Sequence, residues 1–298
     1  MHWLSGTIHT AFVTCSAFVL LVSSSQGADW SSFRGPSGDG ISTAIKLPLK
    51  WSATENVDWK TPLKGQGWSS PVLRDDVLYI TNAVAENAEA AKTSYQLNTV
   101  AIDSESGKIL WTTKVFEQPI GSAAIHSKNS HASPTPIVTS THVYVHFGHI
   151  GTACLTVKGD VVWKTLPSKY SPVHGNGGTP ILHDGKLYFS VDGKVKTLVI
   201  CLDAATGDTV WEFDRQSAAP RKFSFTTPAI IAVDGKYQLI SPASDIVQAI
   251  DPQTGALLWH VKYDGYSLIP KPVYHNGLLY VCTGYNTPWL YCIDPTGK

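Results

Sequence analysis

Eleven histidines are the residues of this 298-residue chain that most readily suggest metal chemistry, because neutral imidazole is a common metal ligand. His142 and His146 share one face of an expected strand, but at about 3.3 Å per residue they stand about 13 Å apart. No cysteine or carboxylate lies between them, and His126 and His131 are spaced less regularly still. The sequence contains no Gly-x-Ser-x-Gly elbow, His-Glu-x-x-His helix or phosphate-binding Gly-Lys-Ser/Thr loop. We therefore predict no metal site and no catalytic residues.

Aromatic, basic and amide side chains gather in segments that precede a recurring proline, and such side chains could bind a ligand or partner by stacking and hydrogen bonding. The expected binding residues are Trp68, His131, His174, Asn176, Arg221, Phe223 and Tyr266. A purely structural explanation stays open. Ser69, Ser70, Gly177 and Gly178 in the same segments suit crowded backbone, and the polar groups would then only face water.

One recurring string indicates which elements position these segments. Its pattern is small-x-Asp-x-x-x-Gly-x-x-x-Trp, as in "AIDSESGKILW", "CLDAATGDTVW" and "AIDPQTGALLW". The copy "CLTVKGDVVW" departs from it, with Thr156 in place of Asp, and a further copy begins with "CIDPTGK" at Cys292. Tryptophans recur 52, 52, 48 and 48 residues apart, at Trp59, Trp111, Trp163, Trp211 and Trp259.

Two short alternating apolar stretches precede each string and indicate a pair of strands. The first stretch follows Pro71, Pro136, Pro180, Pro228 or Pro272, and the second carries a tyrosine. Asp184-Gly185, Asp234-Gly235 and Asn276-Gly277 predict tight hairpins between them. Four short strands with their turns fill about 45–50 residues, the period of a propeller blade. The predicted fold is all-β, a β-propeller of four-stranded antiparallel blades.

Each residue type in the string has an expected structural role. The aspartates cap a turn between the third and fourth strands, the glycines adopt positive φ there, and each tryptophan docks on the neighbouring blade. The aspartates are Asp103, Asp203 and Asp251, and the glycines are Gly107, Gly159, Gly207 and Gly255.

The strings resemble the tryptophan-docking motif of quinoprotein-type propellers, the PQQ-like repeat family that includes pyrroloquinoline quinone (PQQ) dehydrogenases and the assembly lipoprotein BamB. Five copies cover most of residues 51–298. "WSSFRGPSGDG", "ENVDWKTPL" and "HGNGGTP" more narrowly resemble an exported PQQ-like family of planctomycete-type bacteria. WD-repeat propellers differ, since they would carry Trp-Asp. The resemblance implies about eight blades in a complete ring.

Trp59 lies in "NVDWKTPL", which suits an outermost strand although no proline or tyrosine strand precedes it. We expect its three partner strands to come from the far end of a longer chain, so these residues read as a C-terminally truncated propeller of about five blades. The expected organisation is a secretory signal at 1–28, an N-terminal extension at 29–50 and a partial propeller at 51–298. The apolar run in the signal is shorter than the roughly 20 residues of a membrane span.

The charge and cysteine content of the chain limit the classes of partner and the compartment that we expect. The 23 basic and 23 acidic residues give a net charge of zero, so we expect no nucleic-acid binding. Cys154, Cys201 and Cys292 occupy the same place in the repeat as Ala101 and Ala249, which favours free core thiols, while a disulfide between Cys282 and Cys292 stays open. An exported, periplasmic or secreted monomer with no membrane span after signal cleavage is expected.

Two functions follow as expectations. The first is a BamB-like scaffold that binds a protein or a cell-envelope component through its channel-rim loops, without a cofactor. The alternative, implied by the resemblance, is a PQQ- and Ca²⁺-dependent alcohol or sugar dehydrogenase. Many such enzymes carry an adjacent Cys-Cys pair over the quinone, and this sequence has none.

Overall fold

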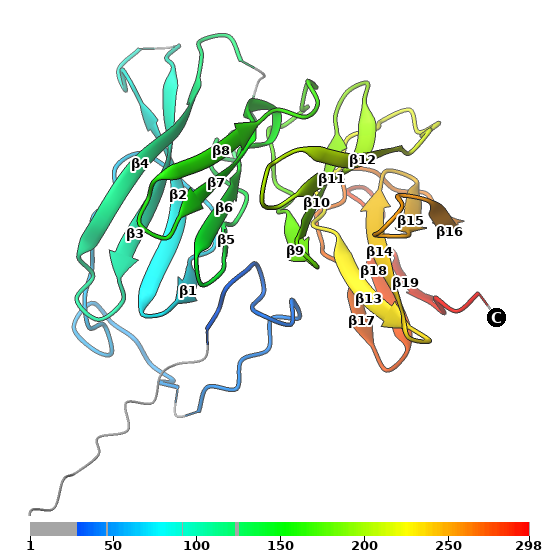
Figure 1. Ribbon diagram of the computed structural model, residues 1–298, viewed down its shortest axis with the longest axis horizontal. Helices are drawn as coiled ribbons and strands as arrows, with labels where there is room; N and C mark the ends of the chain where they lie inside the picture. The colour runs from blue at the N-terminus through cyan, green and yellow to red at the C-terminus, as the bar shows by residue number, and fades with distance from the viewer. Residues whose placement is uncertain (1–28, 46, 91, 123–124, 298) are drawn as a thin grey trace, which may run out of the picture.

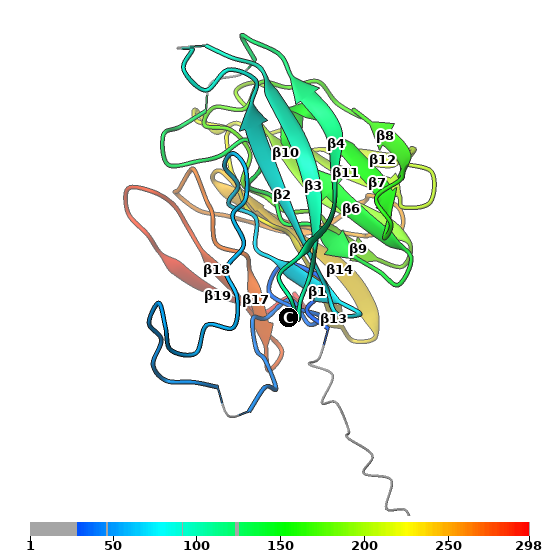
Figure 2. The ribbon, with the colours of Figure 1, turned by 90° about the vertical axis from the view of Figure 1, so that its left-hand side faces the viewer.

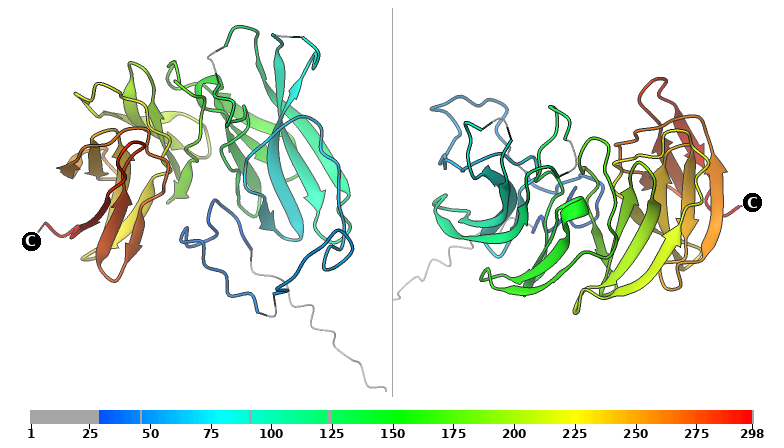
Figure 3. Two further views of the ribbon diagram at one scale, coloured as in Figure 1. Left: turned by 180° about the vertical axis from the view of Figure 1, so that it is seen from behind. Right: turned by 90° about the horizontal axis from the view of Figure 1, so that it is seen from above.

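The computed structural model describes residues 29–45, 47–90, 92–122 and 125–297. This part of the chain folds into five antiparallel sheets that follow one another in chain order round an open arc (Figure 1; Figure 3, right). The first four sheets have four strands and the fifth has three. The prediction of an all-β chain of propeller blades is therefore confirmed. The expected signal at 1–28 lies outside the described residues.

The sheets are numbered here as blades 1 to 5. Blade 1 contains β1 (Val72–Arg74), β2 (Val77–Ala85), β3 (Tyr95–Asp103) and β4 (Ile109–Gln118). Blade 2 contains β5 (Ile137–Val138), β6 (His142–His146), β7 (Thr152–Thr156) and β8 (Val161–Thr165), with the 3₁₀ turn η1 at Gly148–Ile150. Blade 3 contains β9 (Ile181–His183), β10 (Lys186–Asp192), β11 (Thr197–Asp203) and β12 (Thr209–Asp214). Blade 4 contains β13 (Ala229–Val233), β14 (Lys236–Ala243), β15 (Ile246–Ile250) and β16 (Leu257–Lys262). Blade 5 contains β17 (Val273–His275), β18 (Leu278–Cys282) and β19 (Leu290–Ile293).

Local sequence explains where the first strand of each blade begins and ends. Each of the five recurring prolines stands immediately before a first strand, where its missing N–H costs no ladder bond. The hairpin after β9 turns at Asp184 and Gly185, whose φ angles of 48° and 68° suit a type I′ turn. The turns after β13 and β17 also have two residues at positive φ.

The hydrophobic core lies between successive blades. Tyr144 of blade 2, for example, packs in one buried cluster with Leu187 and Phe189 of blade 3. Along β10 and β11, residues that face blade 2 alternate with residues that face blade 4. The sheet of blade 3 therefore contributes to two interfaces. Stacking of the blades thus buries both faces of the inner strands.

Four of the five tryptophans of the repeat bridge one unit to the next. Their Nε1 atoms donate at 2.9–3.1 Å to carbonyls in the following turn, which are those of Ser104, Val157, Ala204 and Pro252. Each indole lies against a positive-φ glycine of that turn: Trp59 against Gly107, Trp111 against Gly159, Trp163 against Gly207 and Trp211 against Gly255. Trp59 occupies this position on blade 1 although it lies outside the named strands.

Two positions depart from the repeat. Trp259 donates at 2.8 Å to Oε1 of Gln238 in its own blade instead of to a following turn. Thr156 replaces the capping aspartate by accepting from the N–H groups of Lys158 and Asp160 through its hydroxyl. In the other turns Asp203 and Asp251 each accept two backbone N–H groups through one carboxylate oxygen.

The four described cysteines are free. Cys154 and Cys201 are buried, each opposite the tryptophan of its own blade. Cys292 is exposed, so its expected place in the core is wrong, because no described strand pairs with β19 on its outer side. The pairing of β18 with β19 places Cys292 opposite Tyr280 and Cys282 opposite Leu290. The two thiols therefore do not face each other, and they form no disulfide.

The N-terminal segment 29–40 lies beside the ends of the first strands (Figure 2). With the first strands of blades 2 to 5 it lines a cavity of about 800 Å³, which forms one mouth of the channel between the blades. Trp30 exchanges two backbone hydrogen bonds of 2.9 Å with Leu73 on β1, and the Ser31 carbonyl accepts from Val138 N–H on β5. Lys271, just before β17, donates to the Gly38 carbonyl. Because this mouth lies at the β1–β2 end of the blades, we call it the hairpin mouth.

Among the described residues, no helix is long and apolar enough to cross a bilayer.

Candidate functional site

A cavity of about 630 Å³ lies over the loops that precede the first strands of blades 2 to 5. We call it the rim pocket. Its rings are those of His126, His174, Phe223, Phe225, Tyr266 and Tyr285. His126, His174, the pair Phe223 and Phe225, and Tyr266 come from four different loops, each separated from the next by one whole blade. Tyr285 lies in the loop that follows β18. The rigid sheets below therefore bring non-repeating loop residues to one place.

Five of these rings form a continuous ladder across the rim. The centroids of His126 and His174 are 5.3 Å apart, those of His174 and Phe223 5.3 Å, and those of Phe223 and Tyr266 5.8 Å. Successive planes in this run are nearly perpendicular, at 83–87°. Tyr285 continues the ladder at 6.0 Å from Tyr266. Edge-to-face contacts of this kind are favourable beyond the area they bury.

The charged groups of the rim pocket are all basic. The Arg221 guanidinium lies 4.4 Å from the centroid of the Tyr266 ring and donates to the Tyr266 hydroxyl. Lys128 also lines the pocket, and no aspartate or glutamate does so among the described residues. The cation–π contact orients the guanidinium over the ladder, so the pocket joins an aromatic surface to positive charge.

Backbone hydrogen bonds hold the rim loops together. Phe225 N–H donates to the Leu268 carbonyl at 2.8 Å, and Ser267 N–H donates to the Phe223 carbonyl at 3.2 Å. On the other side, the His174 carbonyl accepts from Asn129 Nδ2 at 2.9 Å. The loops of neighbouring blades are thus tied to one another, and the pocket exists before any ligand arrives.

Four of the seven residues predicted to bind a ligand meet in the rim pocket: His174, Arg221, Phe223 and Tyr266. The other three lie elsewhere. His131 packs against Tyr95, with ring centroids 4.3 Å apart and planes tilted by 45°, and burial lowers the pKa of its imidazole. Asn176 points into the interior, where its Oδ1 accepts the Tyr170 hydroxyl.

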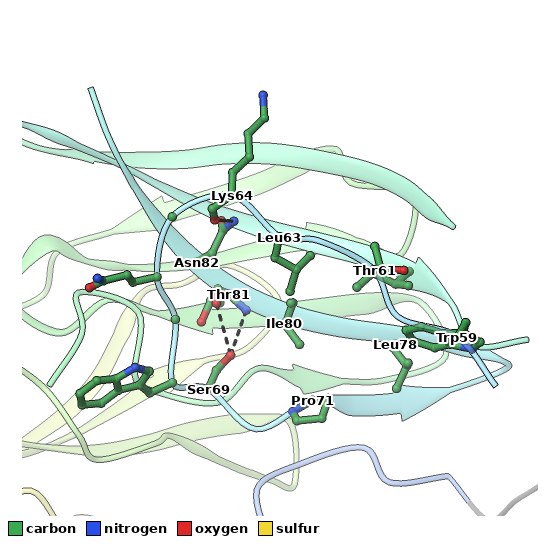
Figure 4. A pocket seen from close by; sticks show the side chains of 15 residues that line it. Trp59, Thr61, Leu63, Lys64, Ser69, Pro71, Leu78, Ile80, Thr81 and Asn82 are labelled. Carbon is green, nitrogen blue, oxygen red and sulfur yellow. Dashed lines mark hydrogen bonds between the residues drawn. The ribbon is translucent and has the colours of Figure 1, made fainter. Parts of the chain in front are cut away.

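Trp68 borders a different groove on the outer flank of blade 1. Figure 4 shows Leu63, Leu78 and Ile80 in the lining of this groove. Leu78 and Ile80 line this groove of about 660 Å³, on the face of β2 that points away from blade 2. The Ser69 hydroxyl accepts from Thr81 N–H at 3.0 Å and fixes the segment that carries Trp68. Trp68 is 51% exposed, and its N–H to the Ala132 carbonyl is its link to the next blade.

A narrow polar chamber lies beneath the rim pocket and shares Gly177 and Phe225 with it. Its carboxylate, Asp192, receives two hydrogen bonds from the buried Arg215, at 2.8 and 3.2 Å. The hydroxyl of Ser224 is buried without a hydrogen-bond partner among the described residues. The chamber therefore holds one hydrogen-bonded ion pair, Asp192 with Arg215, and one buried hydroxyl, that of Ser224, without a partner among the described residues.

The donors present do not fit Ca²⁺ under a quinone. Ca²⁺ takes six to eight oxygen ligands, several of them carboxylates, and no described carboxylate lines the rim pocket. Asp192 is committed to Arg215, and the Asn176 amide is committed to Tyr170. Within the described ranges, no three His, Cys, Asp or Glu side chains converge as metal ligands.

His126, Lys128 and Tyr285 belong to the pocket but were not among the expected binding residues. A signal existed for Tyr285, since the loop "GYNTPW" is aromatic and polar. The loop before Pro136 carries both His126 and His131, and the sequence could not tell which of the two faces the rim.

Comparison with known proteins agrees with the fold. Residues 49–190 match the family model described as "Outer membrane protein assembly factor BamB". No curated protein matches the sequence of the chain. BamB from Moraxella catarrhalis aligns with 16% identity and a TM-score of 0.45, over 79% of this chain and 73% of that one.

Two solved dehydrogenases align over more of this chain. A europium-containing methanol dehydrogenase has 13% identity and a TM-score of 0.55, covering 89% of this chain and 56% of that one. The quinohemoprotein alcohol dehydrogenase from Comamonas testosteroni has 14% identity and a TM-score of 0.56, covering 90% and 48%. At these identities the likeness is one of fold. The chain spans about half the length of these two dehydrogenases.

Proposed function

Because the chain is built from PQQ-like β-propeller repeats similar to those of BamB, we propose that it is an exported, non-catalytic binding module. In this proposal the rim pocket holds a protein or another cell-envelope component, and the protein acts as a periplasmic or secreted monomer. The observation that carries the proposal is the ladder of rings with Arg221 at its edge. Aromatic and arginine side chains supply most of the energy at protein interfaces.

The pocket also has the pre-organisation that binding favours. Its loops are already joined by backbone hydrogen bonds such as that from Phe225 to Leu268. A ligand would then pay little to order them, so more of the contact energy would appear as affinity. The pocket lining contains no carboxylate or cysteine, and its two imidazoles, those of His126 and His174, pack edge to face in the ladder of rings.

Affinity capture tests this proposal. The purified full chain is immobilised and exposed to an envelope extract of the source cells, and Arg221→Ala/Phe223→Ala is compared with wild type. We expect the double variant to lose a partner that wild type retains. The matched control is Lys158→Ala/Trp51→Ala, which removes an exposed cation and an exposed ring far from the rim and should retain the partner. Equal capture by the rim variant and wild type would argue against the rim pocket as the contact.

The alternative, a PQQ- and Ca²⁺-dependent dehydrogenase, shares the fold and is tested separately. Calorimetric titration of the full-length mature protein with PQQ and Ca²⁺ should give no saturable heat. One-to-one binding at micromolar or tighter affinity would favour the dehydrogenase and call for a substrate screen.

A further inference from the structure

The geometry of the rim pocket points to one class of ligand: we infer that it takes an extended, acidic polypeptide segment that carries bulky apolar side chains. This inference rests on the proposed function, since it names the chemistry of the partner for the same pocket.

The charge of the pocket is local and one-sided. Lys128 and Arg221 line it, together with the imidazoles of His126 and His174, and no described carboxylate does. The whole chain is neutral, with equal numbers of acidic and basic residues, so this bias does not follow from overall composition. Arg221 uses Nη1 on the Tyr266 hydroxyl, and among the described residues its other guanidinium N–H groups have no acceptor. Side-chain carboxylates would complete them, with two parallel hydrogen bonds where the planes align.

The shape of the ladder favours side chains over sugar rings. A polysaccharide stacks best on aromatic faces that lie in one plane, whereas successive rings from His126 to Tyr266 are turned by 83–87°. Such a run offers an uneven apolar surface on which ring edges alternate with ring faces. The ring centroids are 5.3–5.8 Å apart. Side chains on one face of an extended peptide recur about every 6.6–6.8 Å, which is close enough to this spacing for successive apolar side chains to pack on successive rings.

Recognition must come from side chains, because the rim backbone is occupied. The N–H groups of Phe225, Ser267 and Tyr285 already donate to carbonyls of neighbouring loops. A peptide therefore cannot be added as a further strand at these positions. Exposed Ile269 and half-buried Phe223 instead offer apolar contact, with the basic groups at the border.

The test uses two fluorescein-labelled twelve-residue peptides, with fluorescence anisotropy as the readout. In one peptide Glu alternates with Leu and Phe, and in the other Gln replaces every Glu. We expect the acidic peptide to bind the full chain at least tenfold more tightly than the Gln peptide in 50 mM salt. This advantage should shrink in 300 mM salt, because exposed ion pairs are screened.

Variants locate the effect. Lys128→Gln/Arg221→Gln should reduce the affinity for the acidic peptide to that for the Gln peptide, while leaving the latter unchanged. Lys108→Gln/Lys158→Gln removes the same charge from outer turns and should bind like wild type. Since Lys128 is an exposed loop residue, the single variant Lys128→Gln provides a fold-neutral check, and thermal melting verifies that all variants fold.

The following results would overturn the inference. Equal affinity for the two peptides, or absence of binding by both, would remove the acidic peptide as the ligand class. Tighter binding of an anionic polysaccharide such as polygalacturonate, in competition with the acidic peptide, would assign the charge to a glycan instead. Capture of a partner that depends on Phe223 but is indifferent to salt would leave the proposed function standing and reject only its acidic character.

Discussion

The Nζ atom of Lys271 donates to the Gly38 carbonyl across 2.8 Å, so the N-terminal segment is joined to the start of blade 5, 233 residues away along the chain. The same segment pairs with β1 through Trp30 and with β5 through Ser31. One short stretch therefore links three blades across the hairpin mouth. It leaves the rim pocket, which lies over the loops at the other ends of the first strands, unobstructed.

Because Lys271 is buried, we expect the free energy of unfolding to increase as the pH rises from about 8 to 10.5. Burial, followed by the charge of Arg34, lowers the pKa of Lys271 to about 8 from 10.5. Between these values the unfolded chain binds more protons at this site than the folded chain, so the free energy of unfolding rises with pH. Urea unfolding from pH 8 to pH 10.5 should show a smaller rise for Lys271→Met than for wild type. Identical slopes in the two proteins would contradict this assignment.

Trp211 should be a major source of inter-blade stability. Its indole donates to the Pro252 carbonyl at 3.1 Å and lies against the turn of blade 4. Truncation leaves a cavity between blades, so Trp211→Ala should cost about 3–5 kcal/mol in chemical denaturation. Trp51→Ala, at an exposed ring, serves as the control and should cost little. A loss below about 1 kcal/mol for Trp211→Ala would remove its docking role.

Gly255 has two features that favour glycine in its turn, a positive φ and close contact with the indole of Trp211. Its φ is +75°, and an added Cβ would lie 2.8 Å from Cδ2 of Trp211. Gly235 has φ +76° but nothing within 4 Å, so Gly235→Ala measures backbone strain alone, about 1–2 kcal/mol. Gly255→Ala should cost about 1–3 kcal/mol more through overpacking. In a Trp211→Ala background that excess should disappear, and an undiminished excess would show that the indole is not the cause.

The buried pair of Asp192 and Arg215 should behave as one unit. Burial raises the pKa of Asp192 to about 6, while the Arg215 guanidinium, whose Nε lies 2.8 Å from Oδ1, acts in the opposite direction and favours the carboxylate. Asp192→Asn and Arg215→Met should each cost about 3–5 kcal/mol, because each leaves an unpaired buried group. The double variant should cost clearly less than the two together. Additive losses in a double-mutant cycle would show that the two side chains act independently.

The repeat made the blades predictable because its signals are local. A proline before the first strand, an Asp-Gly hairpin and a tryptophan four residues after a glycine each act within a few residues. Trp259 shows the limit, since its string matches the others while its indole bonds to Gln238. Cys292 shows another, because its exposure depends on which strand covers β19.

The rim pocket was only partly predictable because its residues do not repeat. The loop positions of Arg221, Phe223 and Tyr266 were enough to place them at the channel rim, but not to pair their rings. Asn176 and His131 have equally suitable loop positions and turn instead to Tyr170 and Tyr95. Side-chain direction in a loop depends on its neighbours in space, which come from other blades, and no local pattern encodes it.

Photo-crosslinking tests the central claim, that the rim pocket is the binding surface, most directly. A benzophenone amino acid replaces Tyr285 at the rim or Tyr237 at the hairpin mouth, two exposed tyrosines on opposite ends of the channel. We expect an adduct with an envelope component from position 285 alone, lost when Arg221→Ala/Phe223→Ala is added. An adduct from position 237 and none from position 285 would contradict the claim.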